Sequence, residues 1–142
     1  MKNTTRLHFG CFNCPREDWL NTDVTPHLFV ARVPGLAWLM HKMGKMTNER
    51  FAEHRQGIYR KIHYLNVTKA WPYSNEIFEA IYSSHVLEHL PLHGAKNCLA
   101  ESYRCLQPGG VLRISVPDLD AQIRNYDPNR SMDWAINLFE AN

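Results

Sequence analysis

The amino-acid sequence predicts an α/β fold in which a mostly parallel sheet is flanked by helices. Two observations carry this prediction. Short segments rich in β-branched and aromatic residues alternate with segments of helical periodicity, and polar residues follow the expected strands. A helix between two strands returns the chain to the same sheet as a right-handed crossover, so the strands pair in parallel. The 142 residues are expected to form a single domain over 1–142.

The first two strands are expected at 6–9 and 19–24. Residues 6–9 form a short alternating segment that stops at Gly10, and Cys11 begins a run with loop chemistry. Pro26 closes the second segment, because it disfavours helix at the residue before it. The link between the two strands is short. It leaves room for one or two helical turns rather than for a crossover helix of typical length.

A helical insertion is expected at about 27–60. Apolar residues recur there at three- and four-residue spacing, and Pro34 and Gly44 divide the region into two or three helices. Its aromatic and methionine side chains are expected to form a packing face rather than a ligand-binding site. These side chains are Phe29, Trp38, Met40, Met43 and Met46.

The second half of the chain continues the alternation. Its β-branched and aromatic segments predict strands at 62–67, 78–83 and 111–116. The spacing of apolar residues predicts an amphipathic helix at 93–106, with Cys98 and Cys105 on its buried face and a Pro-Gly-Gly segment at its end. Two further helices are expected at 119–126 and 131–139.

The composition argues against several kinds of protein. The formal net charge is only +2 and the lysines and arginines are scattered, so we expect no nucleic-acid partner. No apolar stretch approaches the length that spans a membrane, and we expect neither a secretory leader nor a membrane partner. A cytoplasmic location is the expectation. A core of this size needs no disulfide, so the four cysteines are expected to be reduced.

Three residues stand where open α/β sheets bind ligands, just beyond the carboxyl ends of strands. Gly10 has no side chain and could let a cofactor approach the backbone, or it could be a plain turn residue. Asp23 could accept hydrogen bonds from ribose hydroxyls, or it could cap a nearby helix. Asn66 could pair with an adenine amino group, or it could occupy an exposed turn.

Two spacings are also typical of zinc ligands. His85, Glu88 and His89 match the His-x-x-Glu-His arrangement of one metalloprotease class and would define a zinc-dependent hydrolase. A proline limits the helix directly after this group, however, and no third ligand is identifiable downstream. Cys11 and Cys14 have the spacing of thiolate ligands, but no second Cys-x-x-Cys motif accompanies them. We therefore expect no metal site.

Several stretches form an ordered set of motifs, and the strongest is Ser84-His85-Val86-Leu87-Glu88-His89-Leu90. The others are 7–11, 18–23, 71–73, 101–110 and 113–118. In order and spacing this set resembles the class I S-adenosylmethionine-dependent methyltransferases, and in particular the methyltransferase type 11-like group. The resemblance implies a Rossmann-like fold, S-adenosyl-L-methionine as the cofactor, and an enzyme that transfers a methyl group to an acceptor.

The resemblance also assigns roles to individual residues. The cofactor-binding residues it implies are Gly10 and Cys11 for the methionine part, Asp23 for the ribose, Asn66 and Val67 for the adenine, and Ser84 and His85 for the methyl-transfer side. If the acceptor is a hydroxyl or an amine, His85 or Glu88 is the nearest candidate catalytic base. The acceptor itself is not identified. A small molecule is the expectation, with sugar, lipid and protein acceptors left open.

Two positions depart from the family pattern near the expected cofactor. Phe12 stands where family members usually carry a second glycine, and its ring could obstruct binding. Asn66 replaces the usual acidic residue, which keeps a carbonyl acceptor for the adenine amino group but loses the charge. These departures leave a catalytically inactive binding or assembly protein of the same fold as an alternative function.

The third departure concerns the end of the sheet. Family members continue past the fifth strand through another helix and an antiparallel hairpin, whereas no such strands follow Val116. The chain is therefore expected to be truncated, with the C-terminal strands of the family fold missing. The fifth strand would then form an exposed edge, and a homodimer is one arrangement that would cover it.

Overall fold

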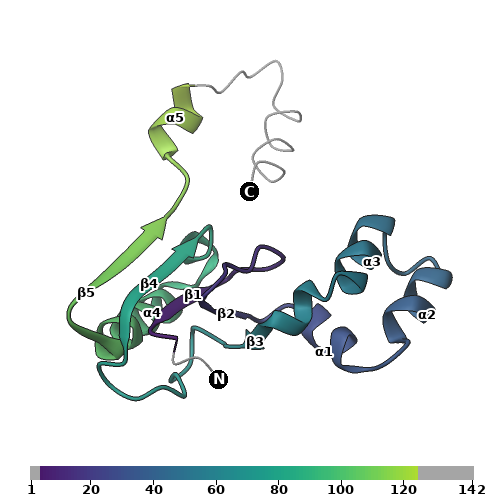
Figure 1. The fold of residues 1–142 in the computed structure, drawn as a ribbon. Helices are drawn as coiled ribbons and strands as arrows, with labels where there is room; N and C mark the ends of the chain where they lie inside the picture. The colour runs from purple at the N-terminus through teal and green to yellow at the C-terminus, as the bar shows by residue number, and fades with distance from the viewer. Residues whose placement is uncertain (1–3, 125–142) are drawn as a thin grey trace.

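A parallel sheet forms the centre of the molecule (Figure 1), and the computed structural model describes residues 4–124. The strands are β1 (Arg6–Phe9), β2 (Leu20–Asp23), β3 (Ile62–Tyr64), β4 (Phe78–Ser84) and β5 (Leu106–Ser115). They lie in the order β3-β2-β1-β4-β5, and every neighbouring pair is parallel. The predicted α/β fold with a Rossmann-like sheet is confirmed. Because the strand order reverses at β1, a topological switch point lies between β1 and β4, where open sheets bind ligands.

The long helix α4 (Leu92–Cys105) covers one face of the sheet (Figure 1). Its side chains Cys98 and Cys105 are completely buried, and they share a core with Phe9 of β1 and Ile81 of β4. Both cysteines are free thiols, and their burial confirms the prediction that they lie on the buried face of this helix. Burial raises the pKa of Cys98 to about 11, so this thiol stays protonated near neutral pH.

One strand boundary differs clearly from the prediction. β5 begins at Leu106, directly after α4, whereas the sequence predicts a start at 111. The Pro-Gly-Gly segment that was expected to separate helix from strand therefore lies inside the strand. A register shift opposite Phe78 and Ala80 of β4 accommodates it.

The end of β3 also differs. This strand stops at Tyr64 rather than at residue 67, because the chain turns at Asn66. The side-chain oxygen of Asn66 accepts hydrogen bonds from the Thr68 N–H at 3.0 Å and from the Thr68 hydroxyl at 2.8 Å. Local side-chain bonds of this kind replace ladder bonds and end regular structure. The C-terminal helix α5 spans Leu119–Arg124, and the rest of the predicted helices at 119–126 and 131–139 lies outside the described residues.

The segment between β1 and β2 contains no helical turn, although the sequence leaves room for one or two. The side chain of Asn21 organises it instead. Its oxygen accepts from the Arg16 N–H at 2.8 Å, and its amide nitrogen donates to the carbonyls of Arg16 and Trp19 at 2.8 and 2.9 Å. The Arg16 guanidinium lies 4.1 Å from the centroid of the Tyr82 ring. The loop therefore lies over β4.

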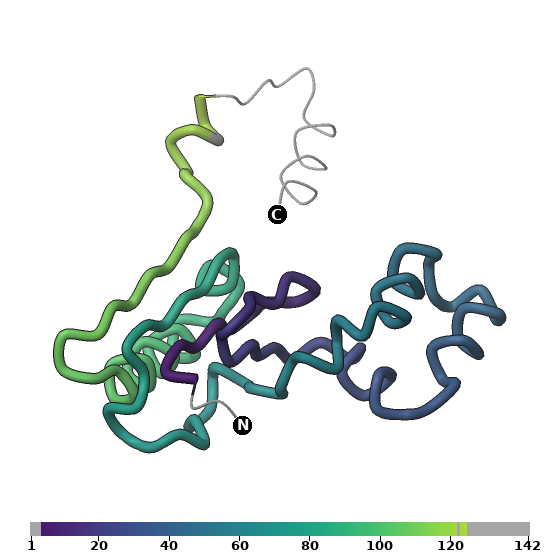
Figure 2. Tube along the Cα trace, viewed as in Figure 1, coloured from purple at the N-terminus to yellow at the C-terminus, as the bar shows by residue number. Residues whose placement is uncertain are grey.

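The helical insertion is present and extends beyond the β3 edge of the sheet (Figures 1 and 2). It consists of α1 (His27–Arg32), α2 (Leu36–Lys42), α3 (Asn48–Arg55) and the short 3-10 helix η1 (Ile58–Lys61). Leu28 and Tyr59 pack with Cys11 and Ile62 in a small core that joins the insertion to the sheet.

The prediction that the aromatic and methionine side chains of the insertion form a packing face is largely wrong. Met46 is buried, but Phe29, Trp38 and Met43 are 59%, 55% and 57% exposed. Helical periodicity predicts an apolar face, but it does not show whether a neighbouring element covers that face. At the other end of the sheet β5 is the edge strand, as expected, and pairing with a second copy stays a prediction. No helix within residues 4–124 is long and apolar enough to cross a membrane.

Candidate functional site

Two adjoining clefts lie at the carboxyl ends of the central strands. The first, of about 530 Å³, is lined by Asp23, Asn66 and Val67 at the ends of β2 and β3. The second, of about 600 Å³, is lined by Cys11 and Ser84, next to β1 and β4. Both clefts share three lining residues, Gly10, Phe12 and His85. The structure therefore brings all the predicted cofactor-binding residues to one continuous region, although their roles stay predictions.

The three shared residues all have a left-handed backbone. The φ angles are +67° at Gly10, +45° at Phe12 and +55° at His85. A residue with a Cβ pays on the order of 1 kcal/mol for this conformation, which therefore persists only where the surroundings impose it. The His85 N–H donates to the carbonyl of Ser115 at 3.0 Å and fixes that turn. Backbone strain of this kind is concentrated at functional sites.

The Asp23 carboxylate is held in a fixed orientation. One oxygen accepts from the Phe12 N–H at 2.8 Å and the other from the Thr25 N–H at 2.7 Å. Asp23 therefore ties the loop after β1 to the residues just before the insertion. It does not cap the helix that follows, because α1 has no side-chain cap. A carboxylate has about four acceptor positions, so each oxygen can still accept a second hydrogen bond from a ligand in the first cleft.

Asn66 offers the cleft a different atom from the one expected. Its side-chain oxygen already accepts two hydrogen bonds from Thr68, whereas the expectation was that this oxygen accepts from an adenine amino group. Its amide nitrogen makes no hydrogen bond within residues 4–124 and is the group left to meet a ligand, as a donor. A ring nitrogen of a base is an acceptor of the matching kind.

His85 and Glu88 lie next to each other, but only His85 lines the clefts. His85 Nδ1 is 3.3 Å from Glu88 Oε1, without the geometry of a hydrogen bond. Glu88 is not part of either cleft lining and begins no regular α-helix, because 87–89 form the 3-10 helix η2 (Leu87–His89). His89 does line the first cleft. Any effect of Glu88 on a ligand would therefore act through His85.

The zinc hypotheses gain no support from the geometry. Across the part of the chain that the structure describes, no three His, Cys, Asp or Glu side chains gather as a metal-ligand set. Cys11 is buried, and burial raises its pKa to about 12, so it is a neutral thiol. Cys14 is exposed, and its thiol lies 3.3 Å from the side-chain oxygen of Asn13.

The insertion supports the loop that lines the clefts, a contact that no sequence pattern indicates. The Arg50 guanidinium lies 4.4 Å from the centroid of the Phe12 ring. The Asn13 amide donates to Glu53 at 2.7 Å across 40 positions of sequence. Glu53 in turn accepts from Arg50 at 2.9 Å and from the Tyr59 hydroxyl at 2.5 Å. Helix α3 therefore holds Phe12 and Asn13 in place.

Two histidines of the insertion form a hydrogen-bonded pair beside this support. His27 Nδ1 and His54 Nε2 are 2.9 Å apart, and His27 stacks on Tyr59 with 4.8 Å between ring centroids. Burial lowers the pKa of both imidazoles. The charge of Arg50 lowers the pKa of His27 further, and His27 does the same to His54. The pair therefore favours the neutral state in the folded chain.

Acidification is expected to destabilise the fold through this pair. Because the folded-state pKa values are lowered below the unfolded value of about 6.5, the unfolded chain binds protons first. The contribution of the neutral histidine pair to the free energy of unfolding is complete above about pH 7.5 and is lost as the pH falls below about 6.5. Urea unfolding at several pH values measures it. His54→Gln should reduce the pH dependence, and the exposed His93→Gln should retain it. Equal pH dependence in both variants would contradict the assignment.

The fold and the clefts define a doubly wound α/β protein with a parallel sheet, a class in which ligands bind at the switch point of the sheet. A family model described as a methyltransferase domain matches residues 39–114, more than half of the 142 residues. The chain belongs to this methyltransferase family. The matched residues begin in α2 and end in β5, so Gly10 and Asp23 lie outside the match. No curated protein matches the chain.

Proposed function

We propose that this chain binds S-adenosyl-L-methionine across the two clefts and transfers its methyl group to a small-molecule acceptor. The observation that carries the proposal is the convergence at the switch point. Residues from the ends of four strands line two clefts that share Gly10, Phe12 and His85. Membership of the methyltransferase family supports the same cofactor.

The first cleft fits the adenosine part of the cofactor. Asp23 is fixed by two backbone N–H groups and keeps acceptor positions for the two ribose hydroxyls. The free amide nitrogen of Asn66 would donate to a ring nitrogen of the adenine. Val67, which is 8% exposed, supplies an apolar contact beside it. Together these three residues offer the acceptor, donor and apolar groups that a nucleoside would need.

The second cleft fits the methionine part and the acceptor. The bound cofactor supplies a methyl group on a sulfonium, which is reactive without further activation. The chain therefore has to orient the acceptor and exclude water. Gly10, Cys11 and Ser84 would contact the methionine part. His85 faces both clefts and could accept a proton from a hydroxyl or amine acceptor, with Glu88 as a positioning residue beside its Nδ1.

A second candidate function is a methyltransferase fold that acts as a binding or assembly protein without turnover. The observation that favours it is Phe12, whose ring is 39% exposed and lines both clefts. Its φ angle of +45° suits glycine, so a large side chain is retained there against a backbone cost. The two candidates differ in whether the unmodified chain binds the cofactor.

Calorimetric titration with S-adenosylhomocysteine tests the proposal. We expect the unmodified chain to bind, and Phe12→Gly to bind at least as tightly because it enlarges both clefts. Glu76→Gly is the matched control, since Glu76 also has a left-handed φ of +56° but lines neither cleft. Binding only by Phe12→Gly would favour the inactive alternative. Binding by neither chain would contradict the cofactor assignment.

A further inference from the structure

The helical insertion is strongly basic. Residues 27–61 contain seven Lys or Arg and two Glu, a formal charge of +5, whereas the whole chain carries +2. Arg50 is paired with Glu53 beneath the loop after β1. The other six cations are all exposed: Arg32, Lys42, Lys45, Arg55, Arg60 and Lys61. The positive charge of this protein is therefore concentrated on the surface of one structural element, which corrects the expectation that the lysines and arginines are scattered.

The same element exposes large apolar side chains. Helix α2 has no buried residue, although its sequence is Leu-Ala-Trp-Leu-Met-His-Lys. The core of the insertion is formed instead by residues of α1 and η1. Large apolar side chains that remain about half exposed or more are Phe29, Val33, Trp38, Leu39 and Met43. Contiguous exposed apolar surface rimmed by polar groups marks an interaction site.

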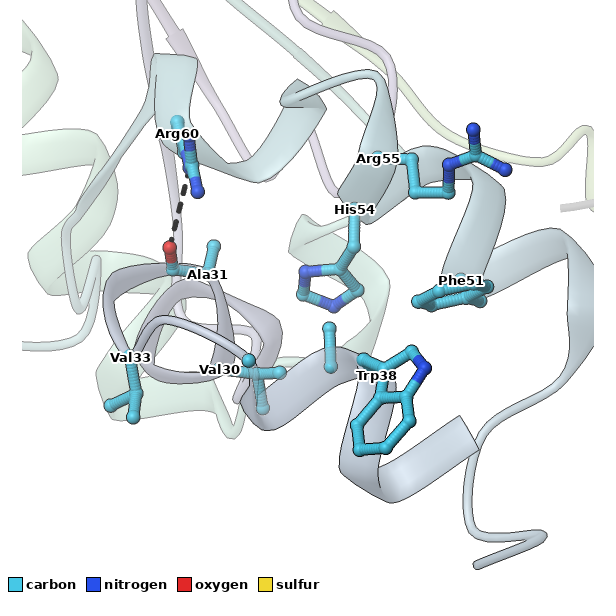
Figure 3. Close-up of a pocket in the computed structure, with 10 residues that line it drawn as sticks. Val30, Ala31, Val33, Trp38, Phe51, His54, Arg55 and Arg60 are labelled. Atoms are coloured by element: carbon cyan, nitrogen blue, oxygen red, sulfur yellow. Dashed lines mark hydrogen bonds between the residues drawn. The ribbon is translucent and has the colours of Figure 1, made fainter. Parts of the chain in front are cut away.

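Some of these cations and apolar side chains lie together on one surface. A hollow of about 330 Å³ is lined by Val33 and Trp38 together with Arg55 and Arg60 (Figure 3). The Lys42 ammonium lies 5.1 Å from the centroid of the Trp38 ring. The Arg55 guanidinium makes no hydrogen bond or ion pair with any residue in 4–124, so it is available to a partner.

We propose that this surface of the insertion docks on a membrane of anionic phospholipids. Trp38, Leu39 and Met43 would enter the interfacial layer, while Lys42 and Arg55 would contact headgroup phosphates. Exposed Trp and Leu side chains beside Lys and Arg are the combination by which surface-bound segments lie on a bilayer without crossing it. Here α2 supplies these apolar side chains and Lys42, while Arg55 belongs to α3. The proposal revises the expectation of no membrane partner and is independent of methyl transfer.

Other occupants fit the surface less well. A symmetric dimer through this face would bring together two insertions that each carry a formal charge of +5, because the same patch meets itself across a twofold axis. A nucleic acid would satisfy the cations but leave Leu39 and Met43 against a charged backbone. An anionic bilayer offers phosphates and an apolar layer at adjacent depths. An acidic protein segment is the remaining competitor.

Sedimentation of the full chain with vesicles tests the charge contribution. We expect binding to vesicles of phosphatidylglycerol and phosphatidylcholine, weakening with salt, and little binding to phosphatidylcholine alone. The double variant Lys42→Gln/Arg55→Gln should lower vesicle affinity roughly 25-fold, since each cation near an anionic surface contributes roughly five-fold. The matched control is Lys96→Gln/Arg113→Gln, which removes two exposed cations elsewhere and should change affinity little.

A second pair of variants tests the apolar contribution. Trp38→Ser/Leu39→Ser should weaken binding at least about ten-fold, because two large side chains no longer leave water. Leu92→Ser/Tyr103→Ser is the matched control, since those side chains of α4 are 73% and 84% exposed. Circular dichroism checks that each variant is folded.

Three outcomes overturn the proposal: no binding to anionic vesicles, equal binding to phosphatidylcholine alone, or equal losses in test and control variants. Retention on immobilised polyglutamate without vesicle binding would also overturn it, and would assign the surface to an acidic protein segment.

Discussion

Gly10→Ala is expected to lower the free energy of unfolding by about 2–4 kcal/mol. A Cβ at this position would lie 2.1 Å from Cγ2 of Val86, well inside van der Waals contact. The φ angle of +67° adds the cost of a left-handed backbone for alanine. Gly10 is therefore required by packing between the end of β1 and the loop after β4, whatever its contact with a cofactor.

Two controls separate the clash from the backbone cost. Gly44→Ala has a similar φ of +69° with no atom within 4 Å of the new Cβ, and should lose only about 1 kcal/mol. In a Val86→Ala background, Gly10→Ala should also cost less, because the clashing methyl group is absent. Urea denaturation measures the unmodified chain, the three single variants and the double variant. Equal losses of stability for Gly10→Ala and Gly44→Ala would show that the Val86 side chain moves aside without lowering the free energy of unfolding.

Asp23→Ala is expected to reduce the affinity for S-adenosylhomocysteine more than about 100-fold, because two hydrogen bonds to a charged group are lost. The carboxylate is already oriented by the N–H groups of Phe12 and Thr25, so a ribose would find it in position. Calorimetric titration measures the loss. Asp120→Ala removes an exposed carboxylate from α5 and should leave affinity unchanged.

The same substitution also removes two backbone contacts. We expect Asp23→Ala to lose about 1–3 kcal/mol of stability, so titrations should be made where unfolding curves show the variant to be folded. Asp23→Asn removes the charge but keeps one acceptor. Its affinity for S-adenosylhomocysteine should lie between the affinities of the unmodified and the Asp23→Ala chains. A folded Asp23→Ala chain that binds S-adenosylhomocysteine as tightly as the unmodified chain would contradict the proposed ribose contact.

Much of the sheet could be predicted because its strands have local signals. The alternation at 6–9 and the break at Gly10 locate β1 and its end. The helical spacing of apolar residues, Cys98 and Cys105 among them, locates α4. The end of β3 could not be found in this way, since it depends on a hydrogen bond between Asn66 and Thr68 side chains. Helical spacing could not distinguish the exposed Trp38 from a packed residue, because burial depends on what lies opposite.

The candidate site likewise could be predicted only in part from the sequence. Strand ends and the family resemblance located Gly10, Asp23 and His85, all of which line the clefts. Which atoms remain free at each residue depends on three-dimensional neighbours. The oxygen of Asn66 is engaged by Thr68. Glu88 stands outside both clefts, because a 3-10 helix rather than a full helical turn follows His85.

The contacts between α3 and the loop after β1 have a thermodynamic consequence. Phe12, which lines both clefts, lies against Arg50, and Asn13 is hydrogen-bonded to Glu53. The loop that lines the clefts is therefore supported by the insertion. Coupling between two binding sites is reciprocal: a ligand that changes the affinity of another is itself affected by the same factor. A ligand on the insertion that displaces α3 would thus change cofactor affinity, and the cofactor would change the affinity of that ligand equally.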